Sequence, residues 1–144
     1  MATGTASARP LHPTVRAFAD KHGIAGAAVR SDGRLTLTLD KKYRVHLQGA
    51  PHNRLALTAQ LLSLPAATGD QKAAAALERL MKTAAGLMRE HAATLCLDAR
   101  QQALLLQQQL PASTDVAALE KGIAAFTNAL AFWSKLGAAE AAAL

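Results

Sequence analysis

The sequence is poor in aromatic residues, which make up 3% of its 144 positions, and it contains a single cysteine, Cys96. One cysteine excludes an intramolecular disulfide and a structural zinc site built from cysteines, and it is typical of a reducing compartment. No window approaches the run of about 18 apolar residues that a membrane-spanning helix needs. Met1 to Val15 lacks the apolar core of a signal peptide. We therefore expect a cytoplasmic protein without membrane insertion.

Motifs for catalysis, metal binding or cofactor binding are also missing. The histidines at positions 12, 22, 46, 52 and 91 contain no i, i+4 pair. We interpret them as surface residues, although His46 and His52 could meet across a turn. Ser63 lacks the glycines of a nucleophile elbow, residues 69–72 lack the spacing of a phosphate loop, and Cys96 is interpreted as a packing residue. The sequence predicts no enzyme, no metal and no cofactor.

The composition that remains is that of one globular domain. Hydrophobic residues make up 51% of the chain, charged residues only 18%, and alanine about a quarter. A chain of 15.0 kDa with this apolar content can bury a core, and its size is that of a single domain. We expect one domain over residues 1–144, with flexible ends at 1–11 and 137–144.

The spacing of apolar residues changes along the chain between the period of a helix and that of a strand. Leu35, Leu37 and Leu39 alternate with threonines, and residues 40–42 form a turn before the next alternating run. Asp70 is a plausible cap for the middle helix, and Thr114 or Asp115 for the last. We predict helices over 13–22, 73–88 and 116–133, and strands over 27–30, 35–39, 43–48, 55–61, 92–97 and 103–110.

This order predicts an α+β fold, with helices packed against one antiparallel sheet. It reads as a helix, a meander of three or four strands, a helix, two strands and a closing helix. The two longer helices carry more apolar surface than a small sheet needs on one side. We therefore predict that the chain forms a homodimer.

The net charge of +6 is unevenly distributed. Residues 1–60 hold nine basic and three acidic residues, whereas the remaining chain holds seven of each and is neutral. One interpretation is a solvated sheet face. A second is a nucleic-acid-binding module, which is weakened because no aromatic residues interleave with the basic ones. That alternative would use Arg30, Arg34, Lys41, Lys42 and Arg44.

The C-terminal half resembles the class I type III secretion chaperones, the Tir chaperone family. The resemblance rests on the order and spacing of Leu95 to Asp98, Leu104 to Pro111, and Phe126, Asn128 and Trp133. Upstream, Leu35 to Asp40 and Leu61 to Pro65 are similar to the meander of the family and its leucine-proline end. The similarity covers residues 12 to 137.

The resemblance implies a homodimer that binds the N-terminal region of a secreted effector, without ATP, and keeps it extended, soluble and competent for export. It implies that the middle helix and the following strand form the dimer interface, through Leu77, Leu80, Met81, Ala84, Leu87, Met88, Leu95 and Leu97. It also implies effector contacts on the first helix and the sheet. The apolar candidates are Val15, Phe18, Leu35, Leu37 and Val45.

The charge of the chain departs from the family, whose members are typically acidic. The basic candidates for effector contact are Arg34, Lys41, Lys42 and Arg44, all within the basic region. From their charge we predict an effector segment with acidic residues near its apolar anchors. Reversing the charge of Lys41, Lys42 and Arg44 should then weaken binding.

Overall fold

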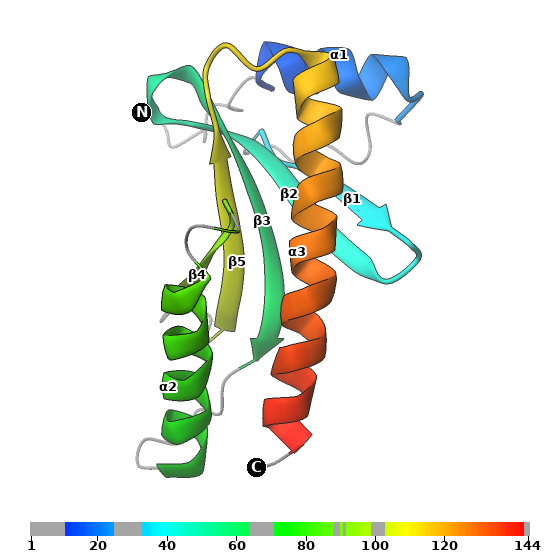
Figure 1. Cartoon of the computed structure of the whole chain (residues 1–144). Helices are drawn as coiled ribbons and strands as arrows, with labels where there is room; N and C mark the ends of the chain where they lie inside the picture. Colours follow the sequence, from blue (N-terminus) through cyan, green and yellow to red (C-terminus); the bar gives the residue numbers. More distant parts are fainter. Residues whose placement is uncertain are drawn as a thin grey trace, which may run out of the picture.

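The computed structural model describes residues 11–24, 33–63, 71–87, 90, 92–98 and 103–142. Within them the predicted α+β fold is confirmed (Figure 1). The predicted strand at 27–30 and the capping role of Asp70 lie outside the described residues. The elements are α1 (Pro13–Lys21), β1 (Leu35–Leu39), β2 (Tyr43–Ala50), the 3-10 turn η2 (Pro51–Asn53), β3 (Arg54–Ser63), α2 (Gln71–Gly86), β4 (Thr94–Asp98), β5 (Ala103–Leu110) and α3 (Val116–Ala142).

The described strands form one antiparallel sheet in the order β1-β2-β3-β5-β4. The meander β1-β2-β3 is extended by β5, which pairs with β3, while β4 occupies the far edge. The long helix α3 packs against β3 and β5. In Figure 1, α1 lies across one end of the sheet and α2 stands beside β4. The helices therefore cover one face of the sheet.

Alternation along the strands determines which residues meet these helices. The odd-numbered leucines of β1, β2 and β3 are buried, except for the half-buried Leu39 and Leu61, and Leu104 and Leu106 of β5 continue the buried face. The opposite face carries a row of polar residues across the strands: Thr36, His46, Thr58, Gln107 and Thr94. One face of the sheet is thus apolar and the other polar, as the sequence predicts.

The turn between β1 and β2 contains the predicted residues 40–42. Asp40 and Lys41 have positive φ angles of 52° and 61°, and the backbone N–H of Lys42 donates to the carbonyl of Leu39 at 3.1 Å. Aspartate tolerates this left-handed conformation better than most residues. The turn therefore brings Lys41 and Lys42 together at the tip of the hairpin.

Helix α3 begins where the carboxylate of Asp115 accepts a hydrogen bond from the backbone N–H of Ala118 at 2.8 Å. Its apolar side faces the core: Leu119, Ile123, Phe126, Leu130 and Trp133 recur at steps of three and four residues and are all buried. The helix continues into the segment predicted to be a flexible end, as far as Ala142. Alanine has the highest helix propensity, and the tail is rich in it.

His12 contradicts its interpretation as a surface residue, because it is only 8% exposed. It precedes α1, and its ring Nδ1 accepts a hydrogen bond from the backbone N–H of Thr14 at 3.1 Å. That acceptor role leaves the proton on Nε2, which donates to the carbonyl of Asn53 at 2.9 Å. One side chain therefore caps α1 and ties it to the turn before β3.

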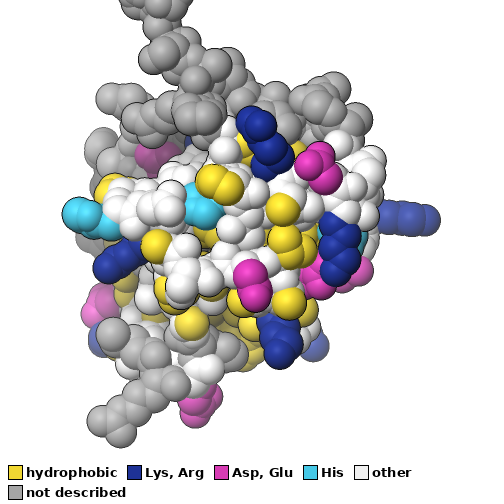
Figure 2. Space-filling model, turned by 90° about the horizontal axis from the view of Figure 1, so that it is seen from above, with side chains coloured by type: hydrophobic (Ala, Val, Ile, Leu, Met, Phe, Trp, Pro, Cys, Tyr) yellow, Lys and Arg dark blue, Asp and Glu magenta, His cyan; other side chains and the backbone are white. Residues whose placement is uncertain are grey.

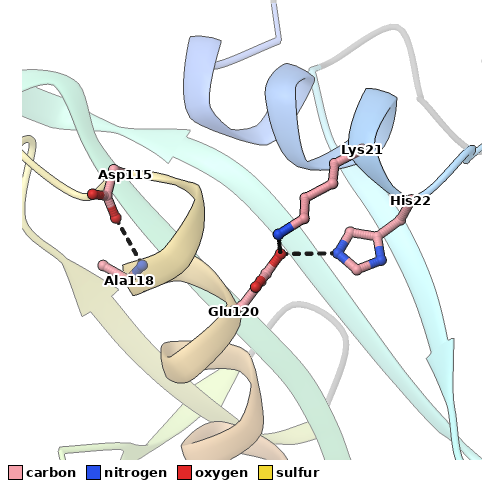
Figure 3. A network of polar contacts seen from close by, with 5 residues as sticks. All are labelled: Lys21, His22, Asp115, Ala118 and Glu120. Atoms are coloured by element: carbon pink, nitrogen blue, oxygen red, sulfur yellow. Dashed lines mark hydrogen bonds and ion pairs between the residues drawn. The ribbon is translucent and has the colours of Figure 1, made fainter.

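Glu120 of α3 links that helix to the end of α1 (Figure 3). Its Oε1 accepts from Lys21 Nζ at 2.7 Å and lies 3.1 Å from His22 Nε2. The hydrogen bond from Lys21 and then that from His22 lower the pKa of Glu120 below its ordinary value. The carboxylate is therefore stabilised in the folded protein.

We expect this contact to stabilise the fold at neutral pH and to fail in acid. Because the pKa of Glu120 is lower in the folded state, its contribution is present above the ordinary carboxyl pKa and disappears as the pH falls through the lowered one. Urea unfolding of the native chain and of Glu120→Gln should therefore differ at neutral pH and converge once the pH is below the lowered pKa of Glu120. A difference that persists in acid would contradict the linkage.

Candidate functional site

The described residues form two hollows that are candidate binding surfaces. No group of three or more His, Cys, Asp or Glu residues in the described ranges could hold a metal ion. Cys96 is half-buried on the polar face of the sheet, where its Sγ lies 3.1 Å from the side-chain oxygen of Gln107. His46 hydrogen-bonds Thr36 across the hairpin, whereas His52 lies in the turn before β3.

The apolar residues predicted to contact an effector lie in the core. Val15, Leu35 and Val45 are 0% exposed, Phe18 is 7% exposed and Leu37 is 9% exposed. In the protomer these five side chains are therefore covered and do not form an accessible surface. The physical reason is that α1 and α3 cover the face of the sheet to which the odd-numbered residues of β1 and β2 belong.

The basic candidates separate into two places. Arg34 precedes β1, and its Nε donates to the side-chain oxygen of Gln48 at 3.3 Å. Lys41, Lys42 and Arg44 are exposed at the opposite end of β1, on and beside the hairpin turn. Arg30 lies outside the described residues. In Figure 2, which views the molecule from above, Lys and Arg side chains alternate with carboxylates and apolar groups instead of forming one continuous patch.

The predicted dimer residues divide by exposure. Leu80 and Leu95 are buried in the protomer, and Met88 lies outside the described residues. Leu77, Ala84 and Leu87 are half-buried, while Met81 is 43% exposed and Leu97 54% exposed. We call Met81, Ala84, Leu87 and Leu97 the α2–β4 surface.

The α2–β4 surface adjoins both a cavity and an edge of the sheet. The cavity has a volume of about 210 Å³ and lies between α2, β4 and α3. Strand β4 is the last in the sheet, so its outer edge has no neighbouring strand among the described residues. Apolar side chains and an open strand edge at the same place are typical of a surface that meets another protein. The cavity is lined by Met81, Ala84, Ala85, Leu87, Ala93, Thr94, Leu95 and Trp133.

A second hollow, which we call the hairpin groove, lies where the β1–β2 hairpin diverges from β3. Pairing between β2 and β3 runs from Ala50 and Arg54 to His46 and Thr58 and goes no further. Figure 1 shows the hairpin leaving the line of β3 beyond that point. The resulting groove measures about 420 Å³. Its lining is Lys42, Tyr43, Arg44, His46, Gln60, Leu61, Leu130 and Ser134.

A bulge in β3 helps to shape the groove. Gln60 pairs with Leu105 and Leu62 pairs with Leu104, so Leu61 is an extra residue without a partner on β5. Such bulges bend a strand and redirect a side chain. Sequence reasoning assigned Leu61 to a regular strand, because an insertion within a run of leucines leaves the apolar pattern almost unchanged.

Comparison with known families identifies the family to which the chain belongs. The model of the Tir chaperone protein (CesT) family matches residues 14–134, which is most of the chain. The chain belongs to the Tir chaperone family. The resemblance seen in the sequence is thereby confirmed. No curated protein sequence matches this family member significantly.

Solved structures of low sequence identity share the fold of this Tir chaperone family member. A chain of the HopA1–SchA chaperone–effector complex is 15% identical with a TM-score of 0.65, over 85% of this chain and 91% of its own length. A chain of the ExsC–ExsE complex is 17% identical with a TM-score of 0.64, and the match covers 88% of this chain and 96% of that chain. A chain of the structure of the Yersinia pestis type III secretion chaperone SycH, solved in complex with a stable fragment of YscM2, is 18% identical with a TM-score of 0.57. The match covers 85% of this chain and 98% of that chain.

These matches give no support to the nucleic-acid alternative. Among the described residues, no helix has the length and apolar character that crossing a bilayer requires.

Proposed function

We propose that this protein is a type III secretion chaperone that binds the N-terminal segment of a secreted effector. Membership of the Tir chaperone family is the observation that carries the proposal. The neighbours in the HopA1–SchA and SycH–YscM2 structures are described as chaperones with bound partners, and they share this fold. A binding role needs only surface complementarity, and it holds the segment extended without ATP.

We also propose that the chaperone is a homodimer in the cytoplasm and that the α2–β4 surface is its interface. The support is physical. Met81 and Leu97 expose apolar side chains beside an open strand edge and the cavity of about 210 Å³. A second copy placed on a two-fold axis would remove both side chains from water. Leu80 and Leu95 would support this interface from within the protomer.

A pull-down from secreting cells tests the chaperone function. The tagged protein should retain a protein that is also found in the secreted fraction, and deletion of the N-terminal segment of that protein should abolish retention. Retention should be unchanged after depletion of ATP, since binding is passive. Retention that requires ATP, or that maps to a folded C-terminal domain of the partner, would overturn the proposal.

A further inference from the structure

The hairpin groove is lined by both basic and apolar side chains. Its walls come from three elements: the hairpin supplies Lys42 and Arg44, β3 supplies Leu61, and α3 supplies Leu130 and Ser134. Leu130 and Ser134 are four residues apart, so they share one face of the helix. A volume of about 420 Å³ falls within the range of pockets that hold small ligands or side chains, roughly 300–1,000 Å³.

The charge at the groove is positive. Among its lining residues, Lys42 and Arg44 are basic and exposed, and none of the eight is acidic. The ammonium of Lys42 also lies 5.0 Å from the centre of the Tyr43 ring, which places that cation at the wall of the groove. Lys41 adds a further charge at the turn, and Asp40 is the carboxylate of that same turn. The hairpin from Asp40 to Arg44 therefore holds three basic groups against one acidic group.

The backbone ladder between β2 and β3 is open beside the groove. Residues Tyr43 to Val45 of β2 pair with β1 and not with β3. Beyond Thr58, β3 pairs with β5 alone, and the bulge residue Leu61 stands outside that pairing. The facing edges of β2 and β3 thus diverge instead of completing the ladder. An extended peptide can hydrogen-bond to such an edge, while its side chains enter pockets on alternate sides.

We infer that the hairpin groove binds an extended acidic segment of the effector, with an apolar side chain on Leu61 and carboxylates beside Lys42 and Arg44. This inference rests on the proposed chaperone function. The charge of residues 1–60 predicts an acidic effector segment. The inference assigns that segment to the hairpin groove, and not to Leu35 and Leu37 of β1, which are buried. An acidic peptide fits better than a single-stranded nucleic acid, because Tyr43 is the only phenylalanine, tyrosine or tryptophan in the lining and Lys42 already contacts its ring.

Fluorescence anisotropy with labelled peptides tests the inference directly. The probes are a short peptide that alternates glutamate with leucine, the same peptide with lysine for glutamate, and a single-stranded RNA oligonucleotide. The native chain should bind the acidic peptide about tenfold or more tightly than the basic one, with an affinity that falls as salt is added. Equal affinity for the two peptides, or preference for the RNA, would overturn the inference.

Two charge-reversal variants locate the site. Lys42→Glu with Arg44→Glu should weaken binding of the acidic peptide by about tenfold or more. Arg54→Glu with Lys121→Glu makes the same change in net charge at exposed residues that do not line the groove, and it should leave binding within about twofold. An equal loss in both variants would show a general charge effect and would contradict a defined groove.

Effector capture separates this inference from the function on which it rests. If the native chain retains a secreted protein that both variants retain equally well, the groove is wrong and the chaperone function stands. If only the variant with Lys42→Glu and Arg44→Glu loses the effector, the chaperone function and the hairpin groove are both supported. If the native chain retains no secreted protein, the proposed function fails, whatever the peptides show.

Discussion

Phe126→Ala is expected to lower the free energy of unfolding by about 3–5 kcal/mol, as for other buried phenylalanines. Phe126 is 0% exposed in the middle of α3, the helix that packs against β3 and β5. Truncation removes apolar surface from the core and leaves a cavity that the neighbouring side chains fill only partly. Because small domains are stable by about 5–15 kcal/mol, a loss of this size is a large fraction of the total. Urea denaturation followed by circular dichroism measures it.

Phe132→Ala is the matched control, since it makes the same truncation six residues further along the same helix. Phe132 is 42% exposed and packs edge-on against Trp133 with ring centres 5.2 Å apart. Phe132 is not a member of the buried core, so we expect a loss of about 1 kcal/mol or less. Equal losses of unfolding free energy in Phe126→Ala and Phe132→Ala would contradict the orientation of α3, in which Phe126 faces the core and Phe132 is exposed.

The sequence predicts most of the fold because two periodic patterns are strong. The alternation from Leu35 to Leu39 identifies β1 and its buried face. The steps of three and four residues from Leu119 to Trp133 identify the buried side of α3. The turn at Asp40 to Lys42 separates two such strands and so fixes the hairpin. Patterns of this kind depend only on local geometry, which a single sequence records.

The candidate site is less predictable because it depends on which surfaces cover one another. Periodicity identifies Leu35 and Val45 as apolar on one face, but it does not say that helices bury that face completely. The hairpin groove depends on where pairing between β2 and β3 ends and on the bulge at Leu61, and neither changes the apolar pattern. His12 illustrates the same limit, since its partner Asn53 is 41 residues away in the chain.

Met81→Glu and Leu97→Glu are each expected to convert the proposed homodimer into a monomer. Both side chains are about half exposed in the protomer, so a glutamate at either position remains hydrated in the monomer and should not disturb its fold. In the dimer the same carboxylate would be buried without a partner, which costs about 3–5 kcal/mol and weakens association by a factor of about 100 or more. Light scattering should report twice 15.0 kDa for the native chain and 15.0 kDa for each variant.

Ala125→Glu is the control for both variants, because it places the same charge on an exposed position of α3 outside the α2–β4 surface. It should remain dimeric and unfold in urea at the same concentration as the native chain. A dimer that survives Met81→Glu and Leu97→Glu would contradict the proposed interface while leaving dimerisation intact. A native chain that is monomeric in light scattering would contradict the proposed homodimer itself. Met81 and Leu97 would then be available to the effector, and each glutamate variant should weaken its capture instead.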